Sequence, residues 1–598
     1  MFVAMDSVLS FLKFIFRYHN KTVNQVLFYI SLICTIVMVL HVGYITDPNL
    51  ARYTQDTVIF MFYGLFAFET IRTVSSIYFT RRINVSHYSG VVVTAYFFLI
   101  TFARLTGGFL ETFSKDEWLY LGILIMFIAE LSRSSLFFDN FYFNPTILFV
   151  VSFLGLIVLG AFLLMLPRTT TEAPLTFVDA FFMATSAVCI TGLSVTDIST
   201  NFSLFGQSVI MALIQIGGLG IMTFTGFFGY FFSGGFSFKN QLMFGEILGE
   251  DKLNSVISTL LTIIFITLLF EFIGGIIIFF TLDSSLFESV GDQIFFAAFH
   301  AISGFCNSGF TIIKDGVTND AYRFNYNFQL AVVSMLILGS LGFGTIFNFY
   351  KLVKEKINSI WCKYILKRGY RHKPMVFTFN SRFIVLCNVI VIVLATVSFF
   401  YMEKEHTLLA DKSTYGQWVS SIFMANSARS AGFNSIDLNF INIPTLIMIV
   451  TIMWIGVSPG STGGGVKVTT VAIALMNIVA LARGKESIEI YKRRIASESV
   501  NKAFAIILLS ILTISFSFIL LNFSDPNQEM MPLLFESVSA YTTCGLSLGI
   551  TPNLSATGKI ILMLTMFVGR VGMLTLLVAF IKNTQNKSYI YPTEKILF

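Results

Sequence analysis

The stretch FVDAFFMATSAVCITGLS, residues 177–194, decides how this chain is built. It starts with a short apolar segment and ends in a small polar run that contains Gly192. A helix needs about 20 apolar residues to cross the hydrocarbon core of a membrane, so the apolar segment is too short to cross one. Three further stretches share this design: IFFAAFHAISGFCNSGFT at 294–311, WVSSIFMANSARSAGFNS at 418–435 and LLFESVSAYTTCGLSLG at 533–549.

The four stretches agree at fixed offsets from one glycine in each. The intervals between these glycines, which are Gly192, Gly309, Gly432 and Gly545, are 117, 123 and 113 residues. Six residues before each glycine stands a small polar residue, namely Ser186, Ser303, Asn426 and Ser539. Ten residues before it stands a large apolar residue, namely Phe182, Phe299, Ile422 and Phe535. A near-constant period with matching positions indicates an internal repeat of four units.

The composition places these units in a membrane. Of the 598 residues, 55% are hydrophobic and 12% are charged, whereas an ordinary soluble domain has about 25% charged residues. So few charges cannot coat the several domains that a soluble chain of this length would form. We therefore expect an all-α polytopic membrane protein. Its expected spans are 23–45, 58–79, 91–102, 118–137, 145–166, 209–232, 256–282, 330–350, 383–401, 443–481, 504–521 and 559–581.

The positive charges set the expected orientation. If the spans alternate from a cytoplasmic N-terminus, most of the 39 Lys and Arg residues fall on the cytoplasmic side, as the positive-inside rule requires. The densest cytoplasmic segment, residues 351–373, holds eight cations and the single acidic residue Glu355. Both termini are therefore expected in the cytoplasm. The modest net charge of +6 does not indicate a nucleic-acid partner.

The four glycine runs need a shared aqueous axis. Non-helical backbone at membrane depth is tolerated only where it is buried in protein or lines a water-filled cavity. Glycine permits a tight turn with carbonyl oxygens facing inward, and four such segments can replace the hydration shell of an ion. The short helices direct their partly negative C-terminal ends at the axis, which favours a cation there.

The span expected at 443–481 is too long for one helix. It contains the run GVSPGSTGGGVK at 456–467, in which Pro459 and the nearby glycines must break a helix within the membrane. A broken segment at this depth has to line the cavity below the glycine runs. There it can obstruct the path and move aside as a gate. A plain structural kink is the alternative.

Ionisable residues inside spans are candidates for function. Arg570 is expected in the middle of the last span, where it either raises a barrier to cations or bonds a carbonyl of a pore loop. Arg429 is expected to tie the third loop to its neighbours. Glu271, Glu69 and Arg72 are expected to be partners between helices.

A second pattern, GxxGxxT, recurs in the returning span of three units. It consists of Gly217, Gly220 and Thr223, then Gly339, Gly342 and Thr345, then Gly569, Gly572 and Thr575. Glycines inside spans commonly let neighbouring helices approach closely, and we expect that role here.

At these residues the sequence resembles the Trk/Ktr/HKT superfamily of potassium transporters, and most closely the bacterial TrkH/KtrB membrane subunits. The resemblance covers residues 144–581. It depends on ITGLS at 190, NSGF at 307, SARSAGFNSID at 427 and TTCGLS at 542. It also depends on SPGSTGGGVK at 458 and VGRVGMLTL at 568, which look like the intramembrane gating loop and the pore arginine of that family.

The resemblance implies a pseudo-fourfold pore that selects K⁺, the transported ion, through filter carbonyls. The filter residues would be Ile190, Thr191, Gly192, Asn307, Ser308, Gly309, Ser430, Ala431, Gly432, Thr543, Cys544 and Gly545. The gating loop would comprise Ser458, Pro459, Gly460, Ser461, Thr462, Gly463, Gly464, Gly465 and Lys467, with Arg570 as the pore barrier. No covalently bound cofactor is expected.

The resemblance also implies a homodimer in the bacterial inner membrane, gated by a cytoplasmic ring subunit that binds the nucleotide. The basic segments 351–373 and 483–494 are expected to dock that regulator, although attraction to anionic lipid also explains them. The expected division is 1–143 for four additional spans, then 144–235, 236–354, 355–485 and 486–598 for the four pore units. Arg133 is the only arginine in the fourth additional span, and a voltage sensor needs several stacked cations, so the additional spans are expected to serve packing or dimer contact.

Two other functions compete with potassium uptake. A sodium-conducting relative or a cation-coupled symporter would use the same fold, and by the pattern of the resembled superfamily glycine at all four positions argues against sodium. An intramembrane enzyme would need a motif such as HExxH or GxSxG with a histidine. The six histidines form no such motif, and His300 is the one histidine in an expected pore helix.

Overall fold

The computed structural model describes residues 20–44, 48–79, 85–106, 114–133, 145–171, 173–219, 256–364, 378–411, 413–485 and 487–580. These residues form a helical molecule, as the apolar spans predict. A small hairpin interrupts the helices where β1 (Glu489–Ile490) pairs antiparallel with β2 (Arg493–Arg494).

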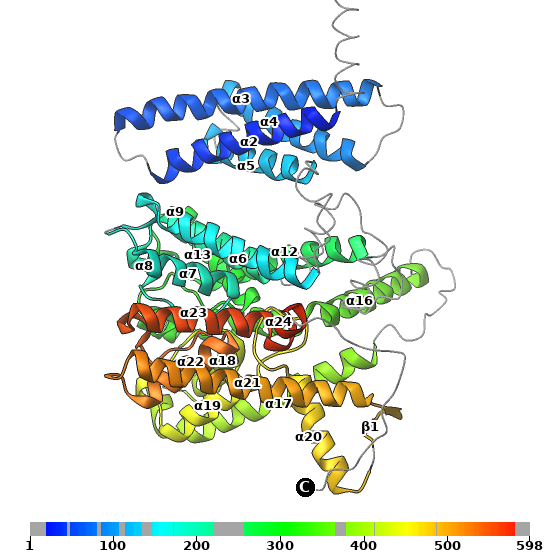
Figure 1. Ribbon diagram of the computed structural model, residues 1–598, viewed down its shortest axis with the longest axis vertical. Helices are drawn as coiled ribbons and strands as arrows, with labels where there is room; N and C mark the ends of the chain where they lie inside the picture. The colour runs from blue at the N-terminus through cyan, green and yellow to red at the C-terminus, as the bar shows by residue number, and fades with distance from the viewer. Residues whose placement is uncertain are drawn as a thin grey trace, which may run out of the picture.

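The N-terminal helices form a bundle of their own at one end of the molecule (Figure 1). They are α2 (Asn20–Gly43), α3 (Pro48–Phe79), α4 (Val85–Thr106) and α5 (Asp116–Arg133). In its core the fully buried rings of Phe62 and Phe97 lie 4.7 Å apart between centroids. Arg72 pairs with Glu69 of its own helix and, at 2.6 Å, with Glu130 of α5. Arg72 therefore links two helices, as expected, through a carboxylate that the sequence did not single out.

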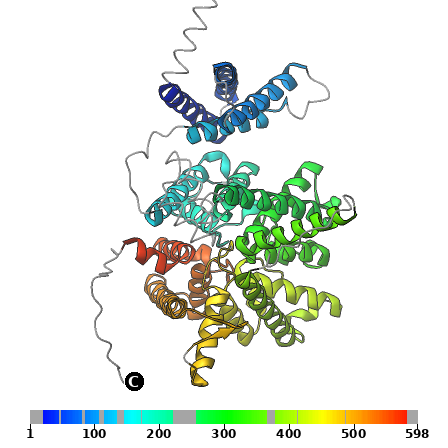
Figure 2. The same cartoon turned by 90° about the vertical axis from the view of Figure 1, so that its right-hand side faces the viewer.

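The remaining helices repeat one design four times: a first helix, a short helix and a returning helix. In the first unit they are α6 (Pro145–Leu164), α7 (Phe177–Cys189) and α9 (Leu204–Gly218); in the second, α12 (Val256–Thr281), α13 (Val290–Cys306) and α15 (Tyr326–Ser340). In the third they are α17 (Phe379–Glu403), α18 (Thr414–Ser430) and α19 (Ile443–Ile455); in the fourth, α21 (Ser497–Ser524), α22 (Met530–Thr542) and α23 (Ala556–Val571). Figure 2 shows the units following one another around a common centre, from cyan through green and yellow to orange and red.

The distribution of side chains fits a bilayer. Large apolar residues point outward on the long helices, and Phe60, Phe280 and Phe523 are 79%, 79% and 82% exposed. Serines and threonines are instead buried toward the centre, as at Ser186, Ser303 and Ser539. In the described part of the chain, five helices are long and apolar enough to cross a membrane, or six if α15 and α16 (Phe343–Tyr364) count as one bent span. The chain is therefore a multi-pass membrane protein.

Two expected spans are not single helices. The span 330–350 breaks after Ser340, and α16 continues from Phe343 at an angle of 101° to α15. The span 559–581 breaks at Gly572, where α24 (Met573–Phe580) takes over. The apolar pattern continues through both breaks, so hydrophobicity alone could not reveal them. The second half of the span 209–232, with Gly220 and Thr223, lies outside the described residues.

The expected unit boundaries remain predictions. The boundary between residues 354 and 355 falls inside α16, whereas residues 235 and 236 lie outside the described residues.

Candidate functional site

The four repeat glycines form a closed ring. A Cβ atom added to Gly192 would collide with the carbonyl oxygen of Ser308, one residue before Gly309. The same relation holds from Gly309 to Ala431, from Gly432 to Cys544, and from Gly545 back to Thr191. Each segment therefore contacts the next through the same atoms, and the fourth closes on the first. Segments 1 and 3 lie opposite each other, as do segments 2 and 4.

The backbone at these four positions also requires glycine. The φ angles of Gly192, Gly309, Gly432 and Gly545 are +89°, +73°, +78° and +90°. L side chains rarely adopt this region. Any side chain here meets both a strained backbone and the carbonyl oxygen of the neighbouring segment, so the ring tolerates no residue larger than glycine without shifting.

Three of the segments leave their short helix by the same turn. Ile190, Asn307 and Thr543 cap α7, α13 and α22 in the left-handed conformation. The next backbone N–H then bonds the carbonyl of the serine that stands six residues before the glycine. These bonds are Thr191 to Ser186 at 2.8 Å, Ser308 to Ser303 at 2.8 Å and Cys544 to Ser539 at 3.0 Å. The small polar residue at this offset is therefore part of the turn.

The third segment is built differently. Its helix α18 runs on through Ser430, and Ala431 has a φ of −116°. The N–H groups of Ala431 and Gly432 bond the carbonyl of Ser427, one residue later than the equivalent serine elsewhere. Asn426, which occupies the serine position, donates instead to Ile422 in its own helix at 2.8 Å. Asn426 therefore shares the offset and the small polar character of the three serines but bonds differently.

The returning helices pack closely on the short helices, as the glycine pattern predicts. An added Cβ on Gly217 would collide with the Val188 carbonyl, and one on Gly569 with the Tyr541 carbonyl. Gly339 has the same relation to Phe305. The second glycine of the pattern has another role, because Gly342 and Gly572 have φ angles of +82° and +86° and mark the two helix breaks. Close helix packing therefore describes the first glycine of the pattern, whereas Gly342 and Gly572 also permit the backbone turn at a helix break.

The predicted break in the third unit is present. Helix α19 ends at Ile455, and α20 (Val468–Ala482) begins after residues 456–467, which we call the intramembrane loop. The loop contacts three of the four glycine segments. Thr462 Oγ1 accepts from Asn307 Nδ2 at 2.7 Å, and the Gly464 N–H donates to Thr543 Oγ1 at 2.9 Å. A Cβ on Gly463 would collide with the hydroxyl of Ser430.

Contacts within the loop and with the second unit hold it in place. Lys467 Nζ folds back onto the carbonyls of Gly463 and Gly464 at 2.7 and 3.2 Å. The Ser458 N–H bonds the Ser340 carbonyl at 3.3 Å, and the Gly460 carbonyl accepts from the Phe343 N–H at 2.9 Å. Pro459 and Ser461 lie within this turn, and Ser461 Oγ donates to Ser458. The loop therefore sits against the break between α15 and α16.

Arg570 joins three units at one point. It is the second-last residue of α23, so the expectation of a mid-helix position was wrong. Its guanidinium is buried and donates through Nη1 to the Thr462 carbonyl of the intramembrane loop. Through Nη2 it donates to the Gly217 carbonyl of α9 at 2.7 Å. Of the two roles expected for this residue, the fork-shaped tie matches these contacts.

Arg429 contacts the first residue of the intramembrane loop, Gly456. It lies fully buried on α18 and donates to Asn388 Oδ1 of α17 at 2.5 Å and to the Gly456 carbonyl at 3.5 Å. Asn388 Nδ2 in turn donates to Ser458 Oγ at 2.8 Å. Arg429 therefore ties its segment to neighbours, as expected. Asn388 was not predicted, because a lone asparagine in an apolar span gives no signal of its partner.

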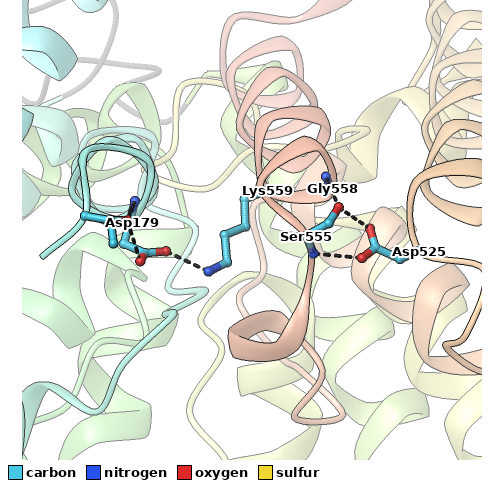
Figure 3. Close-up of polar contacts among 6 residues, drawn as sticks. Asp179, Asp525, Ser555, Gly558 and Lys559 are labelled. Carbon is cyan, nitrogen blue, oxygen red and sulfur yellow. Dashed lines mark hydrogen bonds and ion pairs between the residues drawn. The ribbon is translucent and has the colours of Figure 1, made fainter.

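An ion pair joins the fourth unit to the first unit near the start of the short helix α7. Figure 3 shows Lys559 of α23 reaching Asp179 in the first turn of α7, with Nζ and Oδ1 2.7 Å apart. On the other side of α23, Asp525 accepts from the backbone N–H and the hydroxyl of Ser555 at 2.7 and 3.0 Å. The Asp179–Lys559 pair spans 380 residues of sequence, so no local pattern could have indicated it.

Glu271 is also a partner between helices, as expected. Its carboxylate accepts from Gln215 Nε2 of α9 at 3.0 Å and from the Cys306 thiol at the end of α13 at 3.8 Å.

These features define a multi-pass membrane protein of four equivalent units around a common centre. Residues 139–590 match the TrkH family of cation transport proteins. The chain is 31% identical over 460 residues to the Ktr system potassium uptake protein B of Bacillus subtilis (strain 168), which covers 76% of this chain and 96% of that protein. It is 32% identical over 450 residues to the protein of the same name from Vibrio alginolyticus, over 75% and 93% of the two chains.

A solved structure shows the same fold. The crystal structure of the potassium transporter TrkH from Vibrio parahaemolyticus aligns with a TM-score of 0.58 at 16% identity, over 83% of this chain and 97% of that one. The chain belongs to the TrkH family of cation transport proteins. It is thus a member of a transporter family and not of an enzyme family.

Proposed function

We propose that this protein takes up K⁺ across a bacterial inner membrane through the ring of four glycine segments. The observation that carries the proposal is the closure of that ring. Four equivalent carbonyls, those of Thr191, Ser308, Ala431 and Cys544, each contact the glycine of an adjacent segment. Four carbonyl-bearing segments around one axis can replace the hydration shell of a cation.

Potassium is the proposed ion for two reasons. Glycine occupies all four ring positions, which is the pattern that the potassium-selective members of the resembled superfamily share. The two relatives named above are both potassium uptake proteins by name. The three residues of each segment, from 190 to 192, 307 to 309, 430 to 432 and 543 to 545, would then form the filter.

The intramembrane loop is the proposed gate. It contacts segments 2, 3 and 4 directly, and Arg570 ties it to the first unit through Gly217. This arrangement is the closed state in the proposal. Movement of the loop away from Asn307 and Thr543 would clear the path while leaving the ring intact.

A cytoplasmic regulator is the proposed trigger for that movement. Both termini would lie in the cytoplasm, and two copies of the chain would assemble as a dimer. The segment 483–494, which includes the β1–β2 hairpin, exposes Arg483, Arg493 and Arg494 and is a docking surface in this proposal. Of the other basic segment, 351–373, residues 365–373 lie outside the described residues.

Ion flux into proteoliposomes tests the proposed function. The full chain is reconstituted, and uptake of K⁺ and of Na⁺ is measured under the same gradient. The proposal expects K⁺ uptake to exceed Na⁺ uptake. Equal uptake, or faster Na⁺ uptake, would favour the sodium-conducting alternative, and absence of both fluxes from inserted protein would overturn the proposal.

A further inference from the structure

Two of the four ring segments carry a buried polar brace behind them. Nine residues before the ring glycine, the short helices carry His300 in the second unit and Glu536 in the fourth. Both side chains are fully buried. At the same offset the first and third units carry Met183 and Phe423, which cannot bond in this way.

The two braces reach the same position of their segments, two residues after the glycine. His300 Nε2 lies 2.8 Å from Thr311 Oγ1, while its Nδ1 lies 2.9 Å from the Phe296 carbonyl. A carbonyl can only accept, so Nδ1 carries the hydrogen and Nε2 of the neutral ring accepts from Thr311. Glu536 Oε1 likewise accepts from the Ser547 hydroxyl.

Each of these two hydroxyl oxygens also accepts a hydrogen bond from a backbone N–H two residues further along the chain. Thr311 Oγ1 accepts from the Ile313 N–H at 3.1 Å, and Ser547 Oγ accepts from the Gly549 N–H at 2.8 Å. Each brace therefore fixes a turn that begins two residues after the ring glycine. In the fourth unit Thr551 adds a bond to Glu536 Oε1 at 2.9 Å.

The placement of the braces is twofold. Because the ring contacts run from segment 1 to 2, 3 and 4 and back to 1, the braced segments 2 and 4 face each other across the centre. A buried ionisable side chain at membrane depth is costly and is usually kept for function. The second oxygen of Glu536, Oε2, is buried with no hydrogen-bond partner among the residues that the structure describes. An apolar residue of similar size, such as Met183 or Phe423, would avoid that cost.

We propose that His300 and Glu536 are positioning residues that set the selectivity of the ring by holding the outer ends of segments 2 and 4. This inference rests on the proposed function, because it assumes that the ring selects ions. In effect the fourfold ring has two rigid and two compliant segments. Rigid carbonyl positions on opposite sides fix the distance across the axis, and this distance decides which dehydrated cation fits.

The test replaces each brace with the residue type that an unbraced unit carries. His300→Phe and Glu536→Met remove the bonds while keeping side chains that the equivalent helices accommodate. Matched controls are Phe423→Leu and Met183→Leu, which change packing at the same offset without loss of a bond. The measurements are the K⁺ to Na⁺ uptake ratio in proteoliposomes and, separately, the maximal K⁺ rate.

The expected result is a fall of about tenfold in the uptake ratio for each brace variant, the size of effect that follows from losing a buried hydrogen bond. The controls should stay within about twofold of the unmodified protein. Glu536→Gln should also stay close to it, because the amide oxygen still accepts from Ser547. The double variant His300→Phe with Thr311→Val should fall no further than Thr311→Val alone, because that change already removes both the bond to His300 and the bond from the Ile313 N–H.

Three results would overturn the inference: unchanged ratios in both brace variants, equal falls in the controls, or a fall in Glu536→Gln as large as in Glu536→Met. The last would assign the effect to charge and not to the bond. If a brace variant is not recovered from membranes, Thr311→Val and Ser547→Ala carry the test from the other end of each bond. Failure of the proposed function is separate, since it would appear as missing or unselective K⁺ uptake in the unmodified protein.

Discussion

The second and third units break their returning helices at the same kind of residue and use the break in opposite ways. In the second unit α15 and α16 are separated by two residues, and Gly342 there has a φ of +82°. In the third unit the break begins at Gly456, with a φ of +58°, but twelve residues pass before α20 starts. The extra residues reach the ring segments, whereas the short break only redirects a helix.

The comparison shows that one repeated unit, broken at a glycine, can supply a redirected helix in one place and a loop against the ring segments in another. The break in the second unit receives the loop of the third, because a Cβ on Gly342 would lie 2.6 Å from the Pro459 carbonyl. The third unit is also the one whose ring segment lacks the left-handed turn. The third unit therefore differs from the other three both in its ring segment and in its loop, and this loop is the gate in the proposed function.

Removing the loop should have the largest effect. Deletion of Pro459–Gly465 eliminates the contacts with Asn307 and Thr543 while leaving the ring itself in place. Basal K⁺ flux should rise by about a hundredfold, as expected for a barrier lowered by about 2.7 kcal/mol. Flux into proteoliposomes is the measurement, with insertion checked by protein recovered in the bilayer. Equal or lower flux would reduce the loop to a structural kink, like the break of the second unit.

A point change within the loop tests the same claim with less disturbance. Gly463→Ala places a Cβ against the Ser430 hydroxyl and should loosen the loop, whereas Gly344→Ala on α16 has no atom within 4 Å of its new Cβ and no positive φ. Basal flux should rise in the first variant and stay near the unmodified level in the second.

Arg570→Ala should have the next largest effect. It removes the donor that ties the loop to α9, and charge-assisted hydrogen bonds of this kind are worth about 1.5–3 kcal/mol. Basal flux should rise by roughly tenfold or more without loss of selectivity. Arg570→Lys separates the two roles of the residue. A lysine preserves a charge barrier but cannot reproduce the fork, so a tie predicts raised flux in Arg570→Lys as well. A fall in flux for Arg570→Ala in folded protein would contradict both roles.

Thr462→Val should have a smaller effect of the same sign. The change is close to isosteric and removes the hydroxyl that accepts from Asn307 Nδ2 and lies 3.4 Å from the Phe305 and Gly339 carbonyls. Loss of these neutral bonds, of which the short one is worth about 1 kcal/mol, predicts a rise in basal flux of about fivefold. Thr451→Val on α19 is the matched control, because its hydroxyl bonds only within its own helix at Ile447. Similar flux in the two variants would show that the bond to segment 2 does not hold the loop.

The Asp179–Lys559 pair should matter least, and for stability alone. It lies far from the loop and joins the first and fourth units, so Asp179→Asn should lower the free energy of unfolding by about 1 kcal/mol and leave basal flux unchanged. Thermal unfolding in detergent is the measurement. The exchanged pair Asp179→Lys with Lys559→Asp should recover stability that either single change loses. No recovery would show that the contact does not stabilise the closed ring.

Much of this arrangement could be predicted from sequence because it repeats. The four glycines can be recognised by their period and by the matching residues at fixed offsets. The loop can be recognised by Pro459 and a glycine cluster within an apolar span. Both signals are visible in the sequence without knowledge of the fold. The breaks at Gly342 and Gly572 could not be recognised, because hydrophobicity continues through them and a glycine in a span has several uses.

The hydrogen-bond partners of individual side chains could not be predicted from the sequence either. Arg570 and Thr462 are 108 residues apart, and Arg429 and Asn388 are 41 residues apart. The difference between Asn426 and the serines of the other units depends on one extra helical residue in α18. Such details follow from packing around the centre and not from any pattern along the chain.

The most direct test of the central claim compares two serine substitutions. Gly432→Ser places a side chain 2.5 Å from the Cys544 carbonyl in the ring. Gly484→Ser, just after α20 and outside the ring, meets similar backbone strain, with φ values of +78° and +68° at the two glycines, but has no atom within 4 Å. The measurement is the K⁺ to Na⁺ uptake ratio of each variant in proteoliposomes. The account predicts that the ratio falls strongly for Gly432→Ser and holds for Gly484→Ser. An unchanged ratio for Gly432→Ser in inserted, conducting protein would contradict the assignment of the glycine ring as the selectivity filter.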